Sequence, residues 1–248
     1  MRLESLLRSA VAGWAVAADT LVVAPTAIAA GVALGPTHGL VNRCYQEFAR
    51  VALLGFGARV ATNGDAHLER DARYVFVSNH TSHLDALAIL RALERHPVRF
   101  VAKQELGRIP LFGAALRATG NVFVQRSDTR RDVSALDAAG RELLDSISVL
   151  FFAEGTRSHN GALGPFKRGA AAFALKAGLA LVPIGVHGSA DIYARGLEVK
   201  RAGTIGVVVG EPVDVAGRSL EDRDALTGEL HDAVEALIEE ARALAGAA

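Results

Sequence analysis

Short apolar runs alternate with amphipathic stretches from about residue 74 to the end of the chain. The runs are continuous, as in parallel strands buried on both faces, and lie at 74–78, 98–102, 122–124, 149–153, 181–186 and 204–209. Periodic apolar positions predict helices at 84–94, 109–117, 132–147, 169–177 and 222–244. This alternation predicts an α/β fold with a mixed, largely parallel sheet flanked by helices.

The amino-terminal region has a different pattern. Residues 14–34 are almost wholly apolar and are interrupted mainly by Asp19, Thr20, Pro25 and Thr26. As a helix this stretch would be roughly 31 Å long, close to the hydrocarbon thickness of a bilayer. Four interpretations remain open: a monotopic anchor or helical hairpin with 45–61 as its second arm, a single span, a cleaved signal peptide, and a buried helix of a soluble protein.

Composition narrows the classes of function. The 27 lysines and arginines balance the 27 aspartates and glutamates without forming a basic stripe, so we expect no nucleic-acid partner. Cys44 is the only cysteine, which excludes a disulfide framework and a cysteine-based zinc site. The histidines lack spacing that converges with carboxylates, so no metal site is predicted. Gly-x-Ser-x-Gly and Gly-x4-Gly-Lys-Ser/Thr motifs are absent from the sequence.

The segment 78–85 carries the main candidate chemistry, because His80 and Asp85 follow an apolar strand directly. A neutral imidazole held by a carboxylate can take a proton from a hydroxyl group near pH 7. Five residues within one helix would separate the two side chains by about 140°, so they meet only if His80 lies in the turn and Asp85 in the first helical turn. The alternative is that Ser82 and Asp85 form an ordinary capping box and His80 is a loop histidine.

Three later segments, 120–126, 151–158 and 182–186, are apolar runs that end in polar or glycine turns. With 78–85, their order and separation resemble the four sequence blocks of the glycerolipid acyltransferases, and most of all the bacterial 1-acylglycerol-3-phosphate O-acyltransferases. The resemblance runs from Tyr74 to Gly188, and 102–107 and 166–169 also look like the family. Two positions depart from it: Ala153 replaces the usual proline, and Gln125 stands where an aspartate is common.

The resemblance implies transfer of a fatty acyl group from acyl-CoA or acyl-ACP to the free hydroxyl of 1-acylglycerol-3-phosphate, giving phosphatidic acid. His80 would be the general base, with Asp85 holding its tautomer. The acyl carrier is a co-substrate, and no further cofactor is implied. The substrates and the oxyanion would be bound by Lys103, Arg126, Glu154, Gly155, Thr156 and Arg157. Two of these have simpler interpretations: Arg126 as an ion pair with Asp128, and Thr156 as a turn or cap residue.

A lipid enzyme fits the anchor interpretation of the amino terminus best, because export would separate the catalytic domain from cytosolic acyl thioesters. We therefore predict membrane-associated helices at 1–63 and an α/β acyltransferase domain at 64–248. The expected location is the cytoplasmic face of the cell membrane, peripheral or monotopic or with a single amino-terminal span. The expected partners are the membrane surface, a membrane lipid acceptor and acyl-CoA or acyl carrier protein. Another lysolipid acceptor such as lyso-ornithine lipid, an inactive lipid-binding protein and simple hydrolysis remain alternatives.

Overall fold

A computed structural model describes residues 3–124, 147–158, 161–193 and 198–248 of the chain. Within these ranges, seven strands form a sheet in the order β1-β7-β6-β2-β5-β3-β4. The strands are β1 (Ala58–Asn63), β2 (Val75–Ser78), β3 (Val98–Lys103), β4 (Val122–Val124), β5 (Ser148–Phe152), β6 (Leu181–His187) and β7 (Gly203–Val209).

Five of these strands, β6, β2, β5, β3 and β4, run parallel to one another. Strand β7 is antiparallel to β6, and β1 is parallel to β7. The predicted mixed, largely parallel α/β sheet is therefore confirmed. Because β2, β5 and β3 are neighbours that point the same way, their carboxyl ends meet at one edge of the sheet, where ligands bind in open α/β folds.

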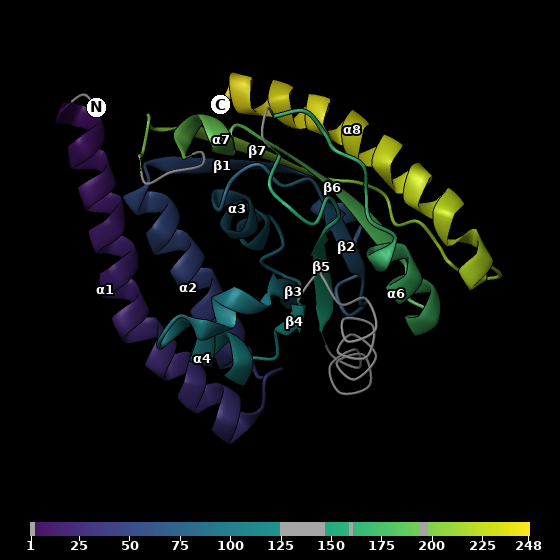
Figure 1. The fold of residues 1–248 in the computed structure, drawn as a ribbon, viewed down its shortest axis with the longest axis horizontal. Helices are drawn as coiled ribbons and strands as arrows, with labels where there is room; N and C mark the ends of the chain where they lie inside the picture. The colour runs from purple at the N-terminus through teal and green to yellow at the C-terminus, as the bar shows by residue number, and fades with distance from the viewer. Residues whose placement is uncertain (1–2, 125–146, 159–160, 194–197) are drawn as a thin grey trace.

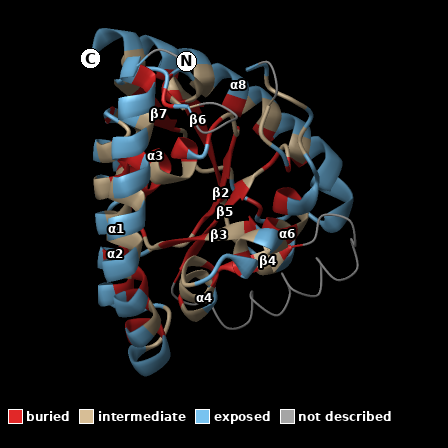
Figure 2. Ribbon diagram, turned by 60° about the vertical axis from the view of Figure 1, so that its left-hand side comes forward, coloured by how far each residue is buried: buried red, intermediate tan, exposed pale blue. Residues whose placement is uncertain are grey.

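Helices cover both faces of the sheet (Figures 1 and 2). One apolar core joins alternate strand residues such as Phe76 and Leu150 to α3 (Leu84–Ala92) and α2 (Gly39–Gly55). The second joins Val77 and Phe151 to α6 (Gly169–Ala177) and α8 (Arg223–Ala247). The remaining elements are α4 (Phe112–Ala118), α7 (Ser189–Ile192) and the 3-10 turns η1 (Asp65–His67), η2 (Gln104–Arg108) and η3 (Leu220–Asp222). The helix predicted at 132–147 lies almost entirely outside the described residues.

Helix α8 approaches the sheet closely over two glycines on neighbouring strands. A Cβ atom at Gly206 would lie 2.0 Å from the carbonyl oxygen of Ala241, and one at Gly185 would lie 2.3 Å from the carbonyl carbon of Leu237. Neither position has room for a methyl side chain between the strand and the helix. Glycine at both positions therefore lets the helix backbone rest directly on β6 and β7.

The amino-terminal helix α1 (Leu3–Leu34) lies beside α2, and the two are joined by the short turn 35–38 (Figure 1). Within the described part of the chain, α1 is the one helix that is long and apolar enough to cross a membrane. Many of its large apolar side chains face outward, including Leu7, Trp14 and Leu21.

The expected second arm at 45–61 was wrong in its bounds, because α2 ends at Gly55 and Ala58–Asn63 are strand β1. Gly57 has a φ of +66°, which allows the chain to leave the helix, and β1 then pairs in register with β7. The strand thus belongs to the sheet although it falls within 1–63. The division of the chain into a membrane-associated segment and a catalytic domain stays a prediction.

A buried arginine ties the two amino-terminal helices to the sheet. Arg99 of β3 is 1% exposed, and it donates hydrogen bonds to the carbonyl of Pro36 in the turn and to Asn42 of α2. Its guanidinium also lies 4.6 Å from the centre of the Tyr45 ring. Because an unpaired buried charge is costly, these contacts fix the position of the helical pair on the sheet.

Candidate active site

The segment between β2 and α3 brings His80 and Asp85 together. Nδ1 of His80 lies 3.0 Å from Oδ2 of Asp85. The imidazole lies in the turn after β2, and the carboxylate lies in the first turn of α3, which is the arrangement that the spacing required. The Asp85 side chain is fully buried, whereas 14% of the His80 side chain is exposed.

The same carboxylate also caps the helix. Oδ2 of Asp85 accepts hydrogen bonds from the backbone N–H of Thr81 at 2.6 Å and of Ser82 at 2.8 Å. The two interpretations of the sequence are therefore compatible, because Asp85 supports both the start of α3 and the imidazole. The other carboxylate oxygen, Oδ1, accepts a hydrogen bond from the hydroxyl group of Ser189.

These contacts assign the tautomer of His80. The two backbone groups on Oδ2 can only donate, so Asp85 acts as the acceptor of its hydrogen bonds. His80 must then carry its proton on Nδ1 and donate it to Asp85. In the neutral imidazole, Nε2 then holds the lone pair and can accept a proton from a hydroxyl group.

The backbone of His80 is held by the turn that follows β5. Its N–H donates to Oε1 of Glu154 at 2.9 Å, and its carbonyl accepts from the N–H of Ser158 at 2.7 Å. The other oxygen of Glu154 accepts the N–H of Gly164 at 3.0 Å. Both carboxylate oxygens of Glu154 therefore bond to backbone groups.

Asn79 holds the same loop from the other side. Its amide donates to the carbonyl of Val186 and accepts the N–H of Val186, both at 2.9 Å. The Asn79 side chain thus gives Val186 of β6 the two hydrogen bonds that a neighbouring strand would supply, one residue beyond the end of β2. Together, the turn after β5 and the end of β6 fix where His80 points.

The imidazole of His80 stacks on the ring of Phe152, the last residue of β5. The two ring centres are 3.9 Å apart and the planes differ by 16°. Phe152 is not among the residues predicted from the sequence, and its position directly before the polar turn of the third block is the signal that would have found it.

Positive charge gathers on the same side. Burial lowers the pKa of His83, and the positive charge of Arg157 and the nearby His80 lower it further, while Asp85 acts in the opposite direction. Arg157 therefore lies close enough to His83 for its charge to act there. A guanidinium in this place is suited to bind a phosphate group with a planar fork of donors.

Comparison with known proteins identifies the family of the chain. A model of the acyltransferase family matches residues 59–187, just over half of the chain. The chain belongs to the acyltransferase family. Within the block pattern, the side chains of His80 and Asp85 contact each other directly.

Individual relatives agree with this assignment. The chain is 36% identical over 172 residues to 1-acyl-sn-glycerol-3-phosphate acyltransferase alpha of Ovis aries and of Homo sapiens, covering 69% of this chain and 60% of each relative. It is 38% identical over 144 residues to a chloroplastic 1-acyl-sn-glycerol-3-phosphate acyltransferase of Arabidopsis thaliana, covering 58% and 40% of the two chains. The matches thus span about 60% or less of these three relatives.

A solved structure shares the whole fold. The 1-acyl-sn-glycerophosphate acyltransferase PlsC of Thermotoga maritima aligns with a TM-score of 0.82 over 97% of both chains, at 24% identity. The match includes the region of α1 and α2, since nearly the whole of this chain is covered. The arrangement of helices on the sheet is therefore that of this acyltransferase.

The other site residues predicted for this chain do not all lie beside the His80–Asp85 pair. Lys103 ends β3, two strands away from β2, and its ammonium group is 3.2 Å from Glu105. Gly155 is buried and has a φ of +73°, and Thr156 beside it is exposed. Arg126 lies outside the described residues.

Gly155 leaves space for the basic side chain of Lys167, which is not among the site residues predicted from the sequence. A Cβ atom at Gly155 would lie 2.7 Å from Cε and 3.0 Å from Nζ of Lys167. The Lys167 side chain thus lies over the turn that holds His80. The backbone N–H of Lys167 donates a hydrogen bond to the carbonyl oxygen of Ala153 at 2.8 Å. Lys167 and Arg157 both place positive charge at this turn.

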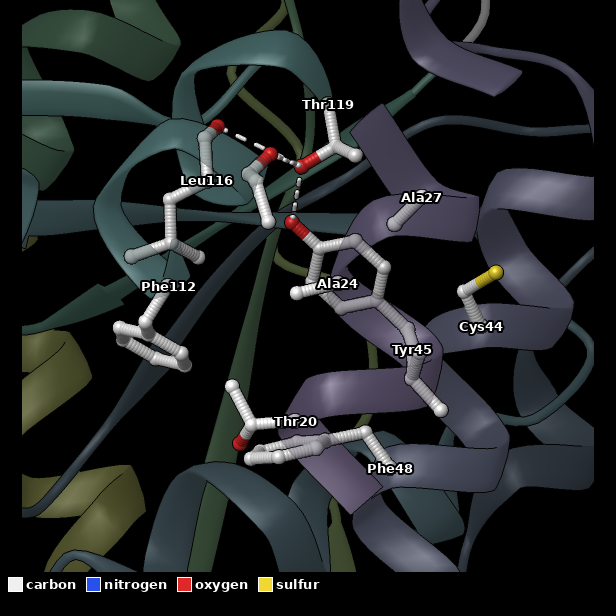
Figure 3. A pocket seen from close by; sticks show the side chains of 11 residues that line it. Thr20, Ala24, Ala27, Cys44, Tyr45, Phe48, Phe112, Leu116 and Thr119 are labelled. Carbon is white, nitrogen blue, oxygen red and sulfur yellow. Dashed lines mark hydrogen bonds between the residues drawn. The ribbon is translucent and has the colours of Figure 1, made fainter. Parts of the chain in front are cut away.

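An apolar pocket opens between α1, α2 and α4 (Figure 3). Its walls include Ala24, Ala27, Phe48 and Leu116, and the hydroxyl groups of Tyr45 and Thr119 meet at its edge, 2.7 Å apart. Neither residue of the His80–Asp85 pair lines this pocket.

Proposed function

We propose that this protein transfers a fatty acyl group from acyl-CoA or acyl-ACP to the free hydroxyl of 1-acylglycerol-3-phosphate, giving phosphatidic acid. The observation that carries the proposal is the His80–Asp85 pair, whose hydrogen bonds leave Nε2 of His80 as the proton acceptor. The names of the relatives, which are 1-acyl-sn-glycerol-3-phosphate acyltransferases, support the same acceptor.

In the proposed reaction, Nε2 of His80 takes the proton of the acceptor hydroxyl while the hydroxyl oxygen attacks the thioester carbonyl carbon. A carbon–oxygen bond forms and the carbonyl oxygen becomes an oxyanion. The intermediate then collapses, the carbon–sulfur bond breaks, and the imidazolium returns its proton to the thiolate. Asp85 stabilises the imidazolium between the two steps, as the carboxylate does in hydrolytic triads.

The oxyanion needs hydrogen-bond donors or positive charge, and this stabilisation is a large part of such catalysis. Lys103 and the backbone N–H groups near Gly155 are the proposed donors. Arg157 and Arg126 are proposed to bind the phosphate of the acceptor. Gly155 and Thr156 belong to the same turn, whereas Glu154 would act mainly by shaping it, since both of its oxygens accept backbone N–H groups.

The outward-facing apolar side chains of α1 support attachment to a membrane, either as a monotopic helical pair or through a single span. We propose the cytoplasmic face of the cell membrane because acyl thioesters are cytosolic. Attachment would place the site beside its lipid acceptor, so the membrane surface, the lysolipid and acyl-CoA or acyl carrier protein are the proposed partners. The apolar pocket between α1, α2 and α4 is suited to the end of an acyl chain.

The test is thiol release from palmitoyl-CoA by the membrane-associated protein, with and without 1-acylglycerol-3-phosphate, beside the variant His80→Ala. We expect release that requires both the acceptor and His80, with phosphatidic acid as product. Release without any acceptor would indicate hydrolysis instead. Activity with lyso-ornithine lipid alone would change the acceptor, and lipid binding without turnover on any thioester would contradict the enzymatic proposal.

A further inference from the structure

Ser189 contacts Asp85 of the His80–Asp85 pair, although it lies 104 residues later in the chain. It is the first residue of α7, two residues beyond the end of β6 at His187, and is fully buried. Its hydroxyl group bonds to Oδ1 of Asp85 and lies 3.0 Å from the hydroxyl oxygen of Thr81. The residue lies outside the apolar run 182–186 that marked the fourth block.

The direction of these hydrogen bonds follows from their partners. An ionised carboxylate only accepts, so the single proton of the Ser189 hydroxyl is donated to Asp85. The oxygen of Ser189 is then free to accept the proton of Thr81. A directed chain results, in which Thr81 donates to Ser189, Ser189 donates to Asp85, and His80 donates to the other oxygen of Asp85.

We infer that Ser189 is a positioning residue for the proposed acyl transfer, acting through Asp85 on the orientation of His80. This inference rests on the proposed role of His80 as the base. With donors on both oxygens, the plane of the carboxylate is fixed and Oδ2 stays directed at Nδ1 of His80. Buried, fully bonded networks of this kind hold a single geometry.

Ser189 also affects how much negative charge the Asp85 carboxylate presents to His80. A hydroxyl donor on Oδ1 draws electron density away from Oδ2. Without it, more negative charge faces the imidazolium, which then keeps its proton to a higher pH. The other charged groups around the turn that holds His80 are Glu154, which binds its backbone N–H, and Arg157 and Lys167, whose positive charges act in the opposite sense. His83 is also nearby, but burial lowers its pKa and so favours its neutral form.

The experiment compares Ser189→Ala and Ser189→Cys with wild type, measuring kcat and KM for palmitoyl-CoA over a range of pH. We expect Ser189→Ala to lower kcat about tenfold to a hundredfold, the range for losing a hydrogen bond to a charged group, with little change in KM. The acid limb of the rate profile should move to higher pH. A thiol is a weaker donor of similar size, so Ser189→Cys should give an intermediate rate and remains informative if the alanine variant does not fold.

Ser148→Ala is the matched control. Ser148 is also buried and its hydroxyl oxygen also accepts a hydrogen bond, from the N–H of Tyr74, but it starts β5 at the opposite end of the sheet from Asp85. It should lower thermal stability without changing kcat or the pH profile. His80→Ala in the same series separates the two ideas, because an active His80 variant would contradict the proposed function. If His80→Ala is inactive and the Ser189 variants keep the wild-type kcat and profile, the inference about Ser189 is wrong.

Discussion

The rings of His80 and Phe152 lie face to face, 3.9 Å apart and within 16° of parallel. Asp85 fixes one edge of the imidazole, and Phe152 fixes its plane. The negative face of an aromatic ring also attracts a cation, so Phe152 favours the imidazolium that forms when His80 takes a proton. A strand residue with no polar group therefore contributes to both the orientation and the charge of the proposed base.

Replacing Phe152 with leucine keeps an apolar side chain but removes the aromatic face. We expect kcat to fall roughly tenfold, in line with a cation–π contribution of about 0.5–2 kcal/mol plus a looser ring. The acid limb of the pH–rate profile should move to lower pH, opposite to the shift expected for Ser189→Ala. Phe151→Leu is the control, because Phe151 packs on Phe173 on the other face of the sheet. An equal shift in both variants would contradict the role of Phe152.

Asp85→Asn tests whether the carboxylate supplies charge or only a cap. The backbone N–H groups of Thr81 and Ser82 can only donate, so the oxygen of the amide should remain on their side and still accept from His80. The tautomer would be kept, and we expect kcat to fall only about tenfold to a hundredfold through loss of charge. Asp85→Ala removes the acceptor as well and should approach the roughly 10⁴-fold loss seen when a triad carboxylate fails. Unchanged kcat in both would leave Asp85 as a cap alone.

The strands of the sheet were predictable where both faces are buried, because their apolar runs are continuous. Val75–Ser78 is the clearest case, with four buried residues in succession. Strand β1 was missed for the opposite reason. It is an edge strand with a mostly half-exposed or exposed pattern, it follows the apolar end of helix α2 after only two residues, and Arg59 and Thr62 interrupt its apolar character. Its place depends on pairing with β7, which lies 145 residues away in the register Ala58–Gly203.

The His80–Asp85 pair was predictable because both residues lie in one segment, where helical geometry limits how they can meet. The contacts that hold the pair were not predictable, although Glu154 was already among the predicted site residues. Ser189 approaches from α7 and Glu154 from the turn after β5, and Asn79 pairs with backbone groups of β6. Bonds from side chains to distant backbone groups leave no periodicity and no spacing in the sequence, so only the fold reveals them.

Glu154→Gln should be damaging although the two side chains have the same shape. Both oxygens of Glu154 accept backbone N–H groups, and a glutamine would place its NH₂ group against one of these donors. We expect a loss of about 1–3 kcal/mol in the free energy of unfolding and a lower kcat, because the His80 backbone is displaced. The measurements are urea denaturation and steady-state kinetics. Glu211→Gln is an exposed control that should change neither. A rise confined to KM for the acceptor would instead make Glu154 a ligand of the substrate.

Arg157→Ala tests the proposed phosphate contact. We expect KM for 1-acylglycerol-3-phosphate to rise about tenfold to a hundredfold, as for loss of charge-assisted hydrogen bonds, with a much smaller change in KM for palmitoyl-CoA. Arg218→Ala removes an arginine that pairs with Glu229 elsewhere on the surface, and should leave both constants unchanged. Equal increases for the two substrates would remove the specific role of Arg157 at the acceptor.

His96 gives the fold a dependence on pH that is separate from the site. The side chain is buried against the edges of Tyr74 and Phe76, and its Nδ1 has no hydrogen-bond partner among the described residues. Burial lowers the pKa of His96; the negative charge of Asp65 opposes this lowering, and the positive charge of Arg95 adds to it with a smaller effect. The folded protein therefore holds this imidazole neutral at pH values where the unfolded chain, with a pKa of about 6.5, is already protonated.

A lowered pKa of a histidine in the folded state means that its contribution to stability is present above about pH 6.5 and is lost as the pH falls below it. The loss can reach about 1.4 kcal/mol per pH unit. We expect wild type to lose more stability between pH 7.5 and 5.5 than His96→Phe, which keeps an aromatic ring between Tyr74 and Phe76 but cannot be protonated. Urea denaturation at both pH values measures this difference. His83 and His187, whose pKa values burial also lowers, are present in both proteins and cancel. Replacing the exposed His67 should leave the wild-type dependence, and the same dependence in His96→Phe would show that His96 is not its source.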